Sequence, residues 1–187
     1  MRTPVASSLA KHAPMPTAPP IIDTERLRLR PHRAEDFADL AVTWSDPLVV
    51  RHIGGRPSTG EESWSRLLRY AGLWALLGFG YWVVVERATG RWAGEVGFAD
   101  FKREMSPSLG GAPEAGWVLA SWCHGNGFAT EAVRAALAWG DVHLPSRRTV
   151  CIIDVENAPS IRVAQKCGYV EYTRSSYKGS ANILFQR

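Results

Sequence analysis

Two glycines one residue apart, Gly125 and Gly127, stand immediately before a stretch with the apolar spacing of a helix. Without a Cβ atom, the backbone at each glycine is free to turn sharply and to expose its N–H groups. The first N–H groups of the following helix have no intrahelical acceptor and lie at the positive end of the helix dipole. Such a turn can hold an anion, and pyrophosphate is the ligand that matches its row of donors.

The segments on either side of the turn predict a strand–turn–helix–strand unit. Residues 114–120 read as a strand, and residues 128–140 read as a helix because apolar side chains recur every fourth position from Phe128 and Ala129. Residues 150–155 then read as a second strand. The turn therefore joins a strand to a helix, which is where phosphate-binding loops are usually built.

A dinucleotide-binding fold would also place glycines between a strand and a helix. Its third glycine position is Thr130 in this chain, and residues 121–124 separate the strand from Gly125 where that fold needs a tight turn. The hairpin predicted for residues 81–101, in the first half of the chain, also fits a dinucleotide-binding fold poorly. We therefore set this alternative aside.

Three segments together resemble a known family. Residues 125–132 (Gly-Asn-Gly-Phe-Ala-Thr-Glu-Ala) resemble the acetyl-CoA pyrophosphate loop of the GNAT N-acetyltransferases, in the form used by the RimJ/RimL-like branch. Residues 157–169 are similar to that branch's Asn-x-x-Ser segment ending in Lys-x-Gly-Tyr, and residues 24–31 resemble its opening strand. The resemblance covers the chain from about residue 21 to its end. The branch often has Trp-Gly-Lys-Gly where this chain has His124-Gly125-Asn126-Gly127, so one positive charge is missing while the backbone donors remain.

The resemblance implies acetyl-CoA as co-substrate and a set of residues that contact it. Backbone N–H groups from about His124 to Ala129 would hold the pyrophosphate, and those of Trp117 to Leu119 would polarise the thioester carbonyl. Arg162 would offer charge to the phosphates, although an arginine on a helix commonly faces solvent. The predicted cofactor-binding residues are Trp117, Val118, Leu119, His124, Gly125, Asn126, Gly127, Phe128, Ala129, Thr130, Asn157, Ser160 and Arg162.

Three side chains are predicted to act in the chemistry of acetyl transfer. Glu114 matches the acidic residue that many relatives place on the strand beside the thioester, where it would serve as general base directly or through water, and Glu95 is a second candidate. Ser160 matches a serine proposed in the branch to protonate the departing CoA sulfur. Each has a plainer interpretation: Glu114 as a solvated strand-end residue, and Ser160 and Asn157 as residues that cap a helix.

The sequence thus predicts an acetyl-CoA-dependent N-acetyltransferase acting on a primary amine, either a protein or peptide N-terminus of the ribosomal-protein type or a small-molecule amine. The alternative is a CoA-binding module of the same family without catalytic activity, which the departures at His124 and Asn126 keep open. The chain carries a net charge of +4 with scattered arginines, so we expect no nucleic-acid partner. The enzyme would be a monomer or a homodimer.

Composition limits the other classes of protein. At 187 residues the chain is long enough for one domain, which we place at residues 21–187, after a disordered tail over residues 1–20 that is rich in proline and alanine. Three cysteines without paired spacing indicate a reducing, cytoplasmic setting. Because the histidines and cysteines show no ligand spacing, we expect no metal, and no stretch is apolar enough to suggest a membrane span.

The remaining pattern predicts a mixed α/β (α+β) fold. Strands are expected at 26–30, 81–85, 92–101, 114–120, 150–155, 169–172 and 183–185, and helices at 37–44, 60–77, 128–140 and 158–167. In the second helix, the residues expected to face inward are Trp64, Leu67, Leu68, Ala71 and either Trp74 or Ala75. The fold would be GNAT-like: a mostly antiparallel central sheet of about seven strands flanked by four helices, with a splayed strand pair that admits acetyl-CoA.

Overall fold

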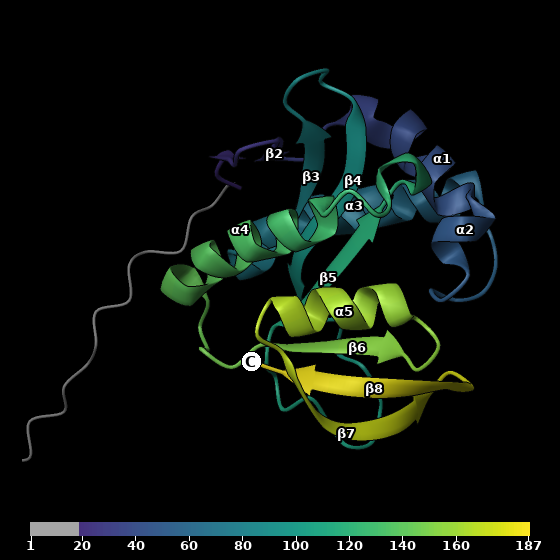
Figure 1. The fold of residues 1–187 in the computed structure, drawn as a ribbon, viewed down its shortest axis with the longest axis vertical. Helices are drawn as coiled ribbons and strands as arrows, with labels where there is room; N and C mark the ends of the chain where they lie inside the picture. The colour runs from purple at the N-terminus through teal and green to yellow at the C-terminus, as the bar shows by residue number, and fades with distance from the viewer. Residues whose placement is uncertain (1–18) are drawn as a thin grey trace, which may run out of the picture.

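The computed structural model describes residues 19–187 and shows one mixed sheet with helices on both of its faces (Figure 1). The eight strands lie in the order β1-β2-β3-β4-β5-β6-β8-β7. Their bounds are β1 Ile22–Asp23, β2 Leu27–Arg30, β3 Tyr81–Glu86, β4 Trp92–Ala99, β5 Glu114–Leu119, β6 Val150–Asp154, β7 Val170–Tyr177 and β8 Ser180–Gln186. All neighbouring strands are antiparallel except β5 and β6, which are parallel.

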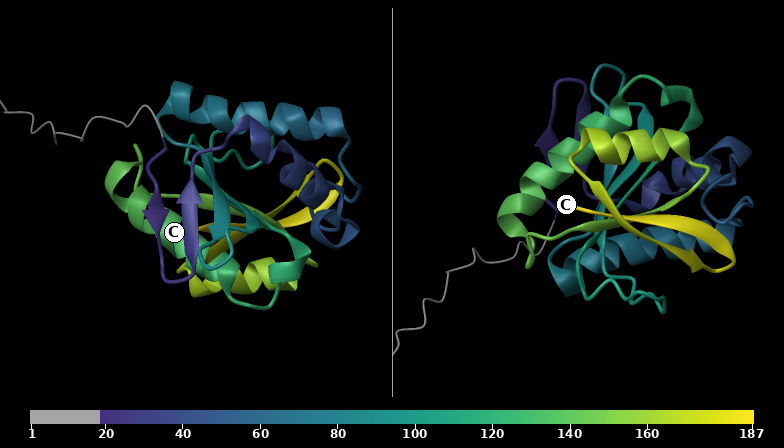
Figure 2. Two further views of the ribbon diagram at one scale, coloured as in Figure 1. Left: turned by 90° about the horizontal axis from the view of Figure 1, so that it is seen from above. Right: turned by 60° about the horizontal axis from the view of Figure 1, so that its bottom comes forward.

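The helices form two layers, one on each face of the sheet (Figure 2). Helices α1 Phe37–Ser45, α2 Pro47–Val50 and α3 Gly60–Leu77 lie on one side, and α4 Phe128–His143 and α5 Ala158–Lys166 lie on the other. One-turn 3-10 helices at Ala34–Asp36 and Ser121–Cys123 lead into α1 and toward α4. Within residues 19–187, no helix is both long enough and apolar enough to cross a membrane.

The predicted mixed fold is confirmed, with one strand and one helix more than expected. Strand β1 has two residues, and helix α2 begins at Pro47 with Asp46 as its cap, accepting a hydrogen bond from the Leu48 N–H. Strands β7 and β8 run longer than the apolar segments predicted, because polar residues with mostly exposed side chains continue the hairpin to its turn. Such short or polar elements carry little periodic signal.

Helix α3 follows its predicted bounds, but its buried face is rotated from the predicted one. Thr59 caps it with the expected capping box: the Thr59 hydroxyl accepts from the Glu62 N–H, and the Glu62 carboxylate accepts from the Thr59 N–H. Leu67 is buried as predicted, whereas Trp64 and Leu68 are largely exposed. Trp74 is buried as predicted and packs on Trp82 of β3, while Tyr70, which was not predicted to face inward, stacks on Tyr81.

The predicted disordered tail lies almost entirely outside the described residues. Pro20, at its end, is described, and its carbonyl accepts a hydrogen bond of 2.9 Å from the Trp82 indole N–H. Pro20, the last residue of the predicted tail, is thus already tied to the sheet, directly before the domain predicted over 21–187.

Close backbone approach in the sheet depends on glycine at β4. A Cβ atom on Gly97 would lie 2.3 Å from the Gly80 carbonyl oxygen and 2.4 Å from Tyr81 Cα, whereas one on Gly72 in α3 would meet nothing within 4 Å. We therefore expect Gly97→Ala to lower the free energy of unfolding by about 1–3 kcal/mol or more, the usual cost of overpacking. Gly72→Ala, the control, should raise it by about 0.5–1 kcal/mol because alanine favours the helix. Urea denaturation measures both, and equal stability of the two variants would contradict this explanation.

Candidate functional site

The strands β5 and β6 diverge immediately after they meet. They pair at one position, Glu114 with Val150, where the Val150 N–H also donates to the Pro113 carbonyl. Because the two strands are parallel and touch at their first residues, the gap between them widens toward their C-terminal ends (Figure 1). These ends lead into α4 and α5 respectively, so both helix N-termini flank the open end of the gap.

Backbone groups of β5 face this gap. The Ala120 N–H donates to the Ala93 carbonyl of the β4 side, and hydrogen-bonding direction alternates along an antiparallel strand. Val118 therefore directs its N–H toward β4, whereas Trp117 and Leu119 direct theirs toward the gap. Of the three residues predicted to polarise a carbonyl there, two present their N–H groups in the required direction.

The glycine turn has the geometry that the sequence predicted. Gly125 and Gly127 both adopt left-handed backbone conformations, with φ of +80° and +79°, which residues with a Cβ rarely take. Gly127 precedes α4 directly, and Phe128 is buried where the helix begins. The turn itself is exposed, so its backbone is open to a ligand.

A row of N–H groups in this turn has no acceptor within the part of the chain that the structure describes. They belong to Gly125, Gly127, Phe128, Ala129 and Thr130. By contrast, the Asn126 N–H donates to the Cys123 carbonyl at 3.4 Å, and the His124 imidazole Nε2–H donates to the Leu119 carbonyl at 2.9 Å. The unpaired donors and the α4 dipole together form a cradle for an anion.

On the other side of the gap, α5 places three of the predicted residues in its first turns. Asn157 is the helix cap, and its side-chain oxygen accepts from the Ser160 N–H at 3.2 Å. The Ser160 hydroxyl is partly buried and has no hydrogen-bond partner among residues 19–187. Arg162 is exposed and makes no ion pair with the described residues, so its charge is available to a ligand.

Glu114 is not solvated: it is buried and held by an arginine. Arg103, from the loop between β4 and β5, donates from Nε to Oε2 and from a terminal nitrogen to Oε1, both at 2.6 Å. Burial disfavours the Arg103 charge, but the hydrogen bonds and negative charge of Glu114 outweigh it and raise the pKa of Arg103 further above its usual range. Glu114 also lines a cavity of about 270 Å³ beneath the same loop, which solvent or a ligand could fill.

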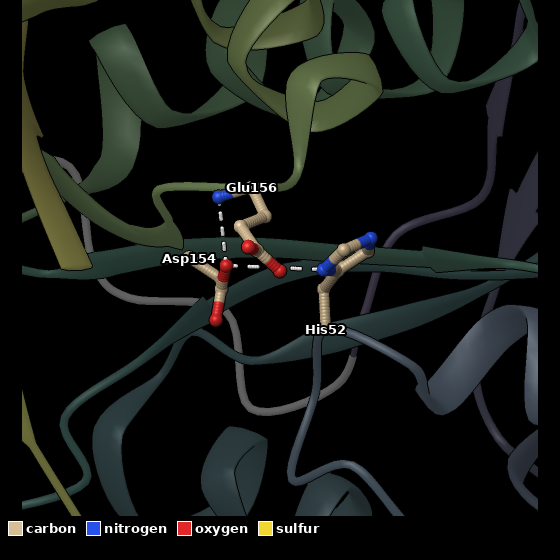
Figure 3. A group of neighbouring side chains, drawn as sticks. All are labelled: His52, Asp154 and Glu156. Atoms are coloured by element: carbon tan, nitrogen blue, oxygen red, sulfur yellow. Dashed lines mark hydrogen bonds and ion pairs between the residues drawn. The ribbon is translucent and has the colours of Figure 1, made fainter. Parts of the chain in front are cut away.

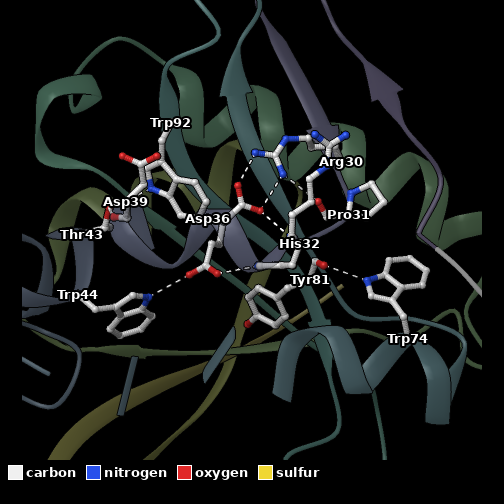
Figure 4. A network of polar contacts seen from close by, with 12 residues as sticks. Arg30, Pro31, His32, Asp36, Asp39, Thr43, Trp44, Trp74, Tyr81 and Trp92 are labelled. Atoms are coloured by element: carbon white, nitrogen blue, oxygen red, sulfur yellow. Dashed lines mark hydrogen bonds and ion pairs between the residues drawn. The ribbon is translucent and has the colours of Figure 1, made fainter. Parts of the chain in front are cut away.

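Glu95 lies on the same face of the sheet, inside a buried polar network. Its partners His32 and Trp44 are shown in Figure 4. Its carboxylate is 1% exposed and accepts from the Trp44 indole N–H at 2.9 Å, while its other oxygen lies 2.8 Å from His32 Nε2. Next to this group, Arg30 forms two hydrogen bonds with Asp36 at 2.6 and 2.8 Å. Both Glu95 oxygens are thus engaged within the protein.

One cluster near the open end of the gap combines a histidine with two acids. His52 Nδ1 lies 3.8 Å from Asp154 Oδ1, and these atoms lie within 4.8 Å of a Glu156 carboxylate oxygen (Figure 3). Asp154 Oδ1 also accepts from the Glu156 N–H at 2.8 Å. Exposed acidic groups often gather without binding an ion. The expectation that no metal takes part therefore gains no test from this cluster and stays a prediction.

The structure thus places the predicted cofactor-binding residues around one gap, with β5 and the glycine turn on one side and α5 on the other. Glu114 lies where β5 and β6 pair, and Glu95 lies on the neighbouring strand β4. Sequence reasoning missed the residues that hold them there. Arg103 lies in a loop that has no periodic pattern. The sequence around Trp44 predicts only a buried helix face, and nothing around His32 indicates a partner. Arg26 was recognised only as part of an opening strand, although the fold brings it against the glycine turn.

Comparison with known proteins agrees with this geometry. Residues 26–170 match the family described as acetyltransferase (GNAT) domain. The uncharacterized protein YkkB of Bacillus subtilis is 29% identical over 165 residues, covering 86% of this chain and 90% of that protein. A structure described as a putative GnaT-family acetyltransferase from Bordetella pertussis is 30% identical, with a TM-score of 0.79, and covers 90% of this chain and 99% of its own.

Two more distant structures share the fold. One is described as RimL, a ribosomal L7/L12 α-N-protein acetyltransferase in complex with coenzyme A, at 17% identity and TM-score 0.73, covering 90% of this chain and 97% of its own. The other is described as a spermidine N-acetyltransferase from Vibrio cholerae in complex with CoA and spermine. It is 16% identical with a TM-score of 0.68, and the match covers 88% of this chain and 96% of its own.

The cradle predicts that acetyl-CoA binding depends on the left-handed glycine before α4. Gly127→Ala should weaken binding because a Cβ at this φ strains the backbone that aims the N–H groups. Gly90→Ala is the matched control: Gly90 has φ +73°, lies in the β3–β4 turn, and would also gain a Cβ without close contacts, with nothing within 4 Å. Both variants should lose similar stability, yet calorimetry should show reduced acetyl-CoA affinity for Gly127→Ala alone. Equal affinity in both variants would rule out the cradle.

Proposed function

The chain belongs to the GNAT acetyltransferase family and is an acyltransferase, and on this premise we propose that it moves the acetyl group of acetyl-CoA to a primary amine. The acceptor would be a protein or peptide N-terminus, as in the RimJ/RimL-like branch, or a small-molecule amine. The observation that carries this proposal is the row of unpaired N–H groups at the open end of the β5–β6 gap.

The described residues fit acetyl-CoA along the whole gap. The N–H groups from Gly125 to Thr130 would hold the pyrophosphate, with Arg162 contributing charge from α5. The pantetheine arm has the polarity to replace the missing strand partner between β5 and β6. The N–H groups of Trp117 and Leu119 point into that space, where one can donate to the thioester carbonyl.

Acetyl transfer then needs two proton movements around one new bond. The neutral amine nitrogen attacks the thioester carbon, the C–S bond breaks, and the product is an amide with free CoA. Glu114 would take the proton of the amine through water in the adjoining cavity, and the Ser160 hydroxyl would give a proton to the CoA sulfur. Both carboxylates have their two oxygens engaged, but Glu114 lines a cavity that can hold water, whereas Glu95 is 1% exposed and so is less suited to proton transfer.

The small number of candidate general bases favours an α-amine as the acceptor. At pH 7, deprotonating an α-amino group costs about 1.4 kcal/mol and a lysine side chain about 4.6 kcal/mol, from pKa values near 8 and 10.4. Both carboxylates on this face already accept two contacts from protein groups. The RimL neighbour, described as an α-N-protein acetyltransferase, is consistent with this preference.

Glu114→Gln should separate chemistry from cofactor binding. Loss of the base is expected to lower kcat by about 10²–10⁴-fold, the range for general acid–base catalysis, while acetyl-CoA affinity stays unchanged. Glu61→Gln, on the exposed first turn of α3, is the control and should keep the wild-type rate. Thiol release measures the rates and calorimetry the affinity. A normal kcat in Glu114→Gln, with Glu95→Gln slow, would move the base to Glu95.

Mass spectrometry of the acetylated products tests the class of acceptor amine. We expect acetylation of peptides with free N-termini and none of the same peptides when the N-terminus is blocked, even if they contain lysine. Small primary amines of modest basicity serve as a second panel. Acetylation confined to lysine side chains would overturn the proposed acceptor, and acetyl-CoA binding without transfer to any amine would favour a module that has lost catalysis.

A further inference from the structure

The guanidinium of Arg26 lies against the glycine turn, 100 residues away in the chain. One of its terminal nitrogens donates to the Asn126 carbonyl at 2.9 Å. Its Nε donates to Glu131 Oε2 at 2.7 Å, and its other terminal nitrogen lies 2.6 Å from the same oxygen. The guanidinium also stands 4.8 Å from the centre of the Phe128 ring. One side chain thus contacts the turn and the first turn of α4 together.

The backbone before β2 completes this connection. Glu131 Oε1 accepts from the Arg26 N–H at 2.9 Å and from the Thr24 hydroxyl at 2.7 Å. Burial disfavours the Glu131 charge, yet the bonds from Thr24 and Arg26 hold the pKa of this carboxyl below its usual value. Glu131 is therefore ionised at neutral pH and fixed by donor atoms of the N-terminal segment.

We propose that Arg26 is a positioning residue for acetyl-CoA, which holds the glycine turn so that its free N–H groups converge on the pyrophosphate. Among residues 19–187, Arg26 makes the sole side-chain hydrogen bond to the backbone of residues 124–127. The other backbone hydrogen bonds of the turn lie at its two ends, where the His124 N–H donates to the Ser121 carbonyl and the Glu131 N–H donates to the Gly127 carbonyl, both at 3.1 Å. Between these ends both glycines are exposed, and the bond from the Asn126 N–H is 3.4 Å long. This proposal rests on the proposed function, because it assigns a partner to the same cofactor loop.

Arg26 also has an electrostatic task at this place. Glu131 stands in the first turn of α4, where a carboxylate is favourable to the helix but repels an anionic ligand held by the same N–H groups. Arg26 neutralises it from the side of the turn. The two tasks are separable, because neutralising Glu131 removes the repulsion but does not restore the bond to Asn126.

Calorimetry with coenzyme A on the full chain tests the proposal. Arg26→Ala should bind coenzyme A about tenfold more weakly or worse, the loss expected for a hydrogen bond from a charged group. Arg28→Ala is the matched control, since Arg28 lies in the same strand region and forms an exposed ion pair with Asp23 at 2.7 Å, away from the turn. Arg28→Ala should bind coenzyme A like the wild type.

Three further measurements distinguish positioning from charge and from general stability. Arg26→Lys should remain weaker than wild type, because an ammonium cannot reproduce the forked contact. The double variant Arg26→Ala/Glu131→Gln should also remain weak, whereas recovery of affinity would mean that Arg26 acts by charge compensation alone. Turnover of S-acetylpantetheine, which lacks the pyrophosphate, should be the same in Arg26→Ala and wild type; a matching loss there would indicate a general structural role.

The outcomes also separate this inference from the function it builds on. If wild-type protein binds no coenzyme A, the proposed function fails and Arg26 has no such role. If the wild type binds and Arg26→Ala binds equally well, with thermal unfolding showing both folded, the proposed function stands and the positioning role of Arg26 is overturned.

Discussion

The single pairing point between β5 and β6 is the constraint on which the rest of the site depends. Parallel strands normally stay paired along their length, since an unpaired backbone buried in a sheet is costly. Here the two strands separate after Glu114 and Val150, which leaves the N–H groups of Trp117 and Leu119 without a strand partner. The sheet stays continuous on both sides because β4 completes β5 and β8 completes β6. The fold thus keeps a gap that a polar, extended ligand can satisfy.

The two helices that begin at the open end of the gap make its two sides chemically different. Helix α4 brings unpaired donors on a left-handed glycine turn, and α5 is capped by Asn157, whose side-chain oxygen accepts from the Ser160 N–H. The difference matters chemically. An N-terminus capped by its own side chain offers fewer donors to an anion, so the α4 end is the better phosphate site and the α5 end is free to present the Ser160 hydroxyl.

Three carboxylates near the gap are compensated within the protein. Glu114 is paired with Arg103, Glu95 accepts from Trp44 and contacts His32, and Glu131 is paired with Arg26. Burying a charge without a partner would cost several kcal/mol, so each carboxylate near the gap required a donor from a distant segment.

The sequence by itself determined the local elements and the conformation of the glycine turn. The glycine turn, the capping box of α3, the hairpin of β3 and β4 and the helix capped by Asn157 all follow from residue types at short spacing, because backbone conformation and capping are local effects. The tertiary structure decided which side chains from distant segments contact one another. It turned Tyr70 rather than Trp64 toward the sheet, placed Arg103 on Glu114 and brought Arg26 to Asn126 across 100 residues. Such contacts depend on which strands become neighbours and where two of them part, and periodicity along one chain does not encode that.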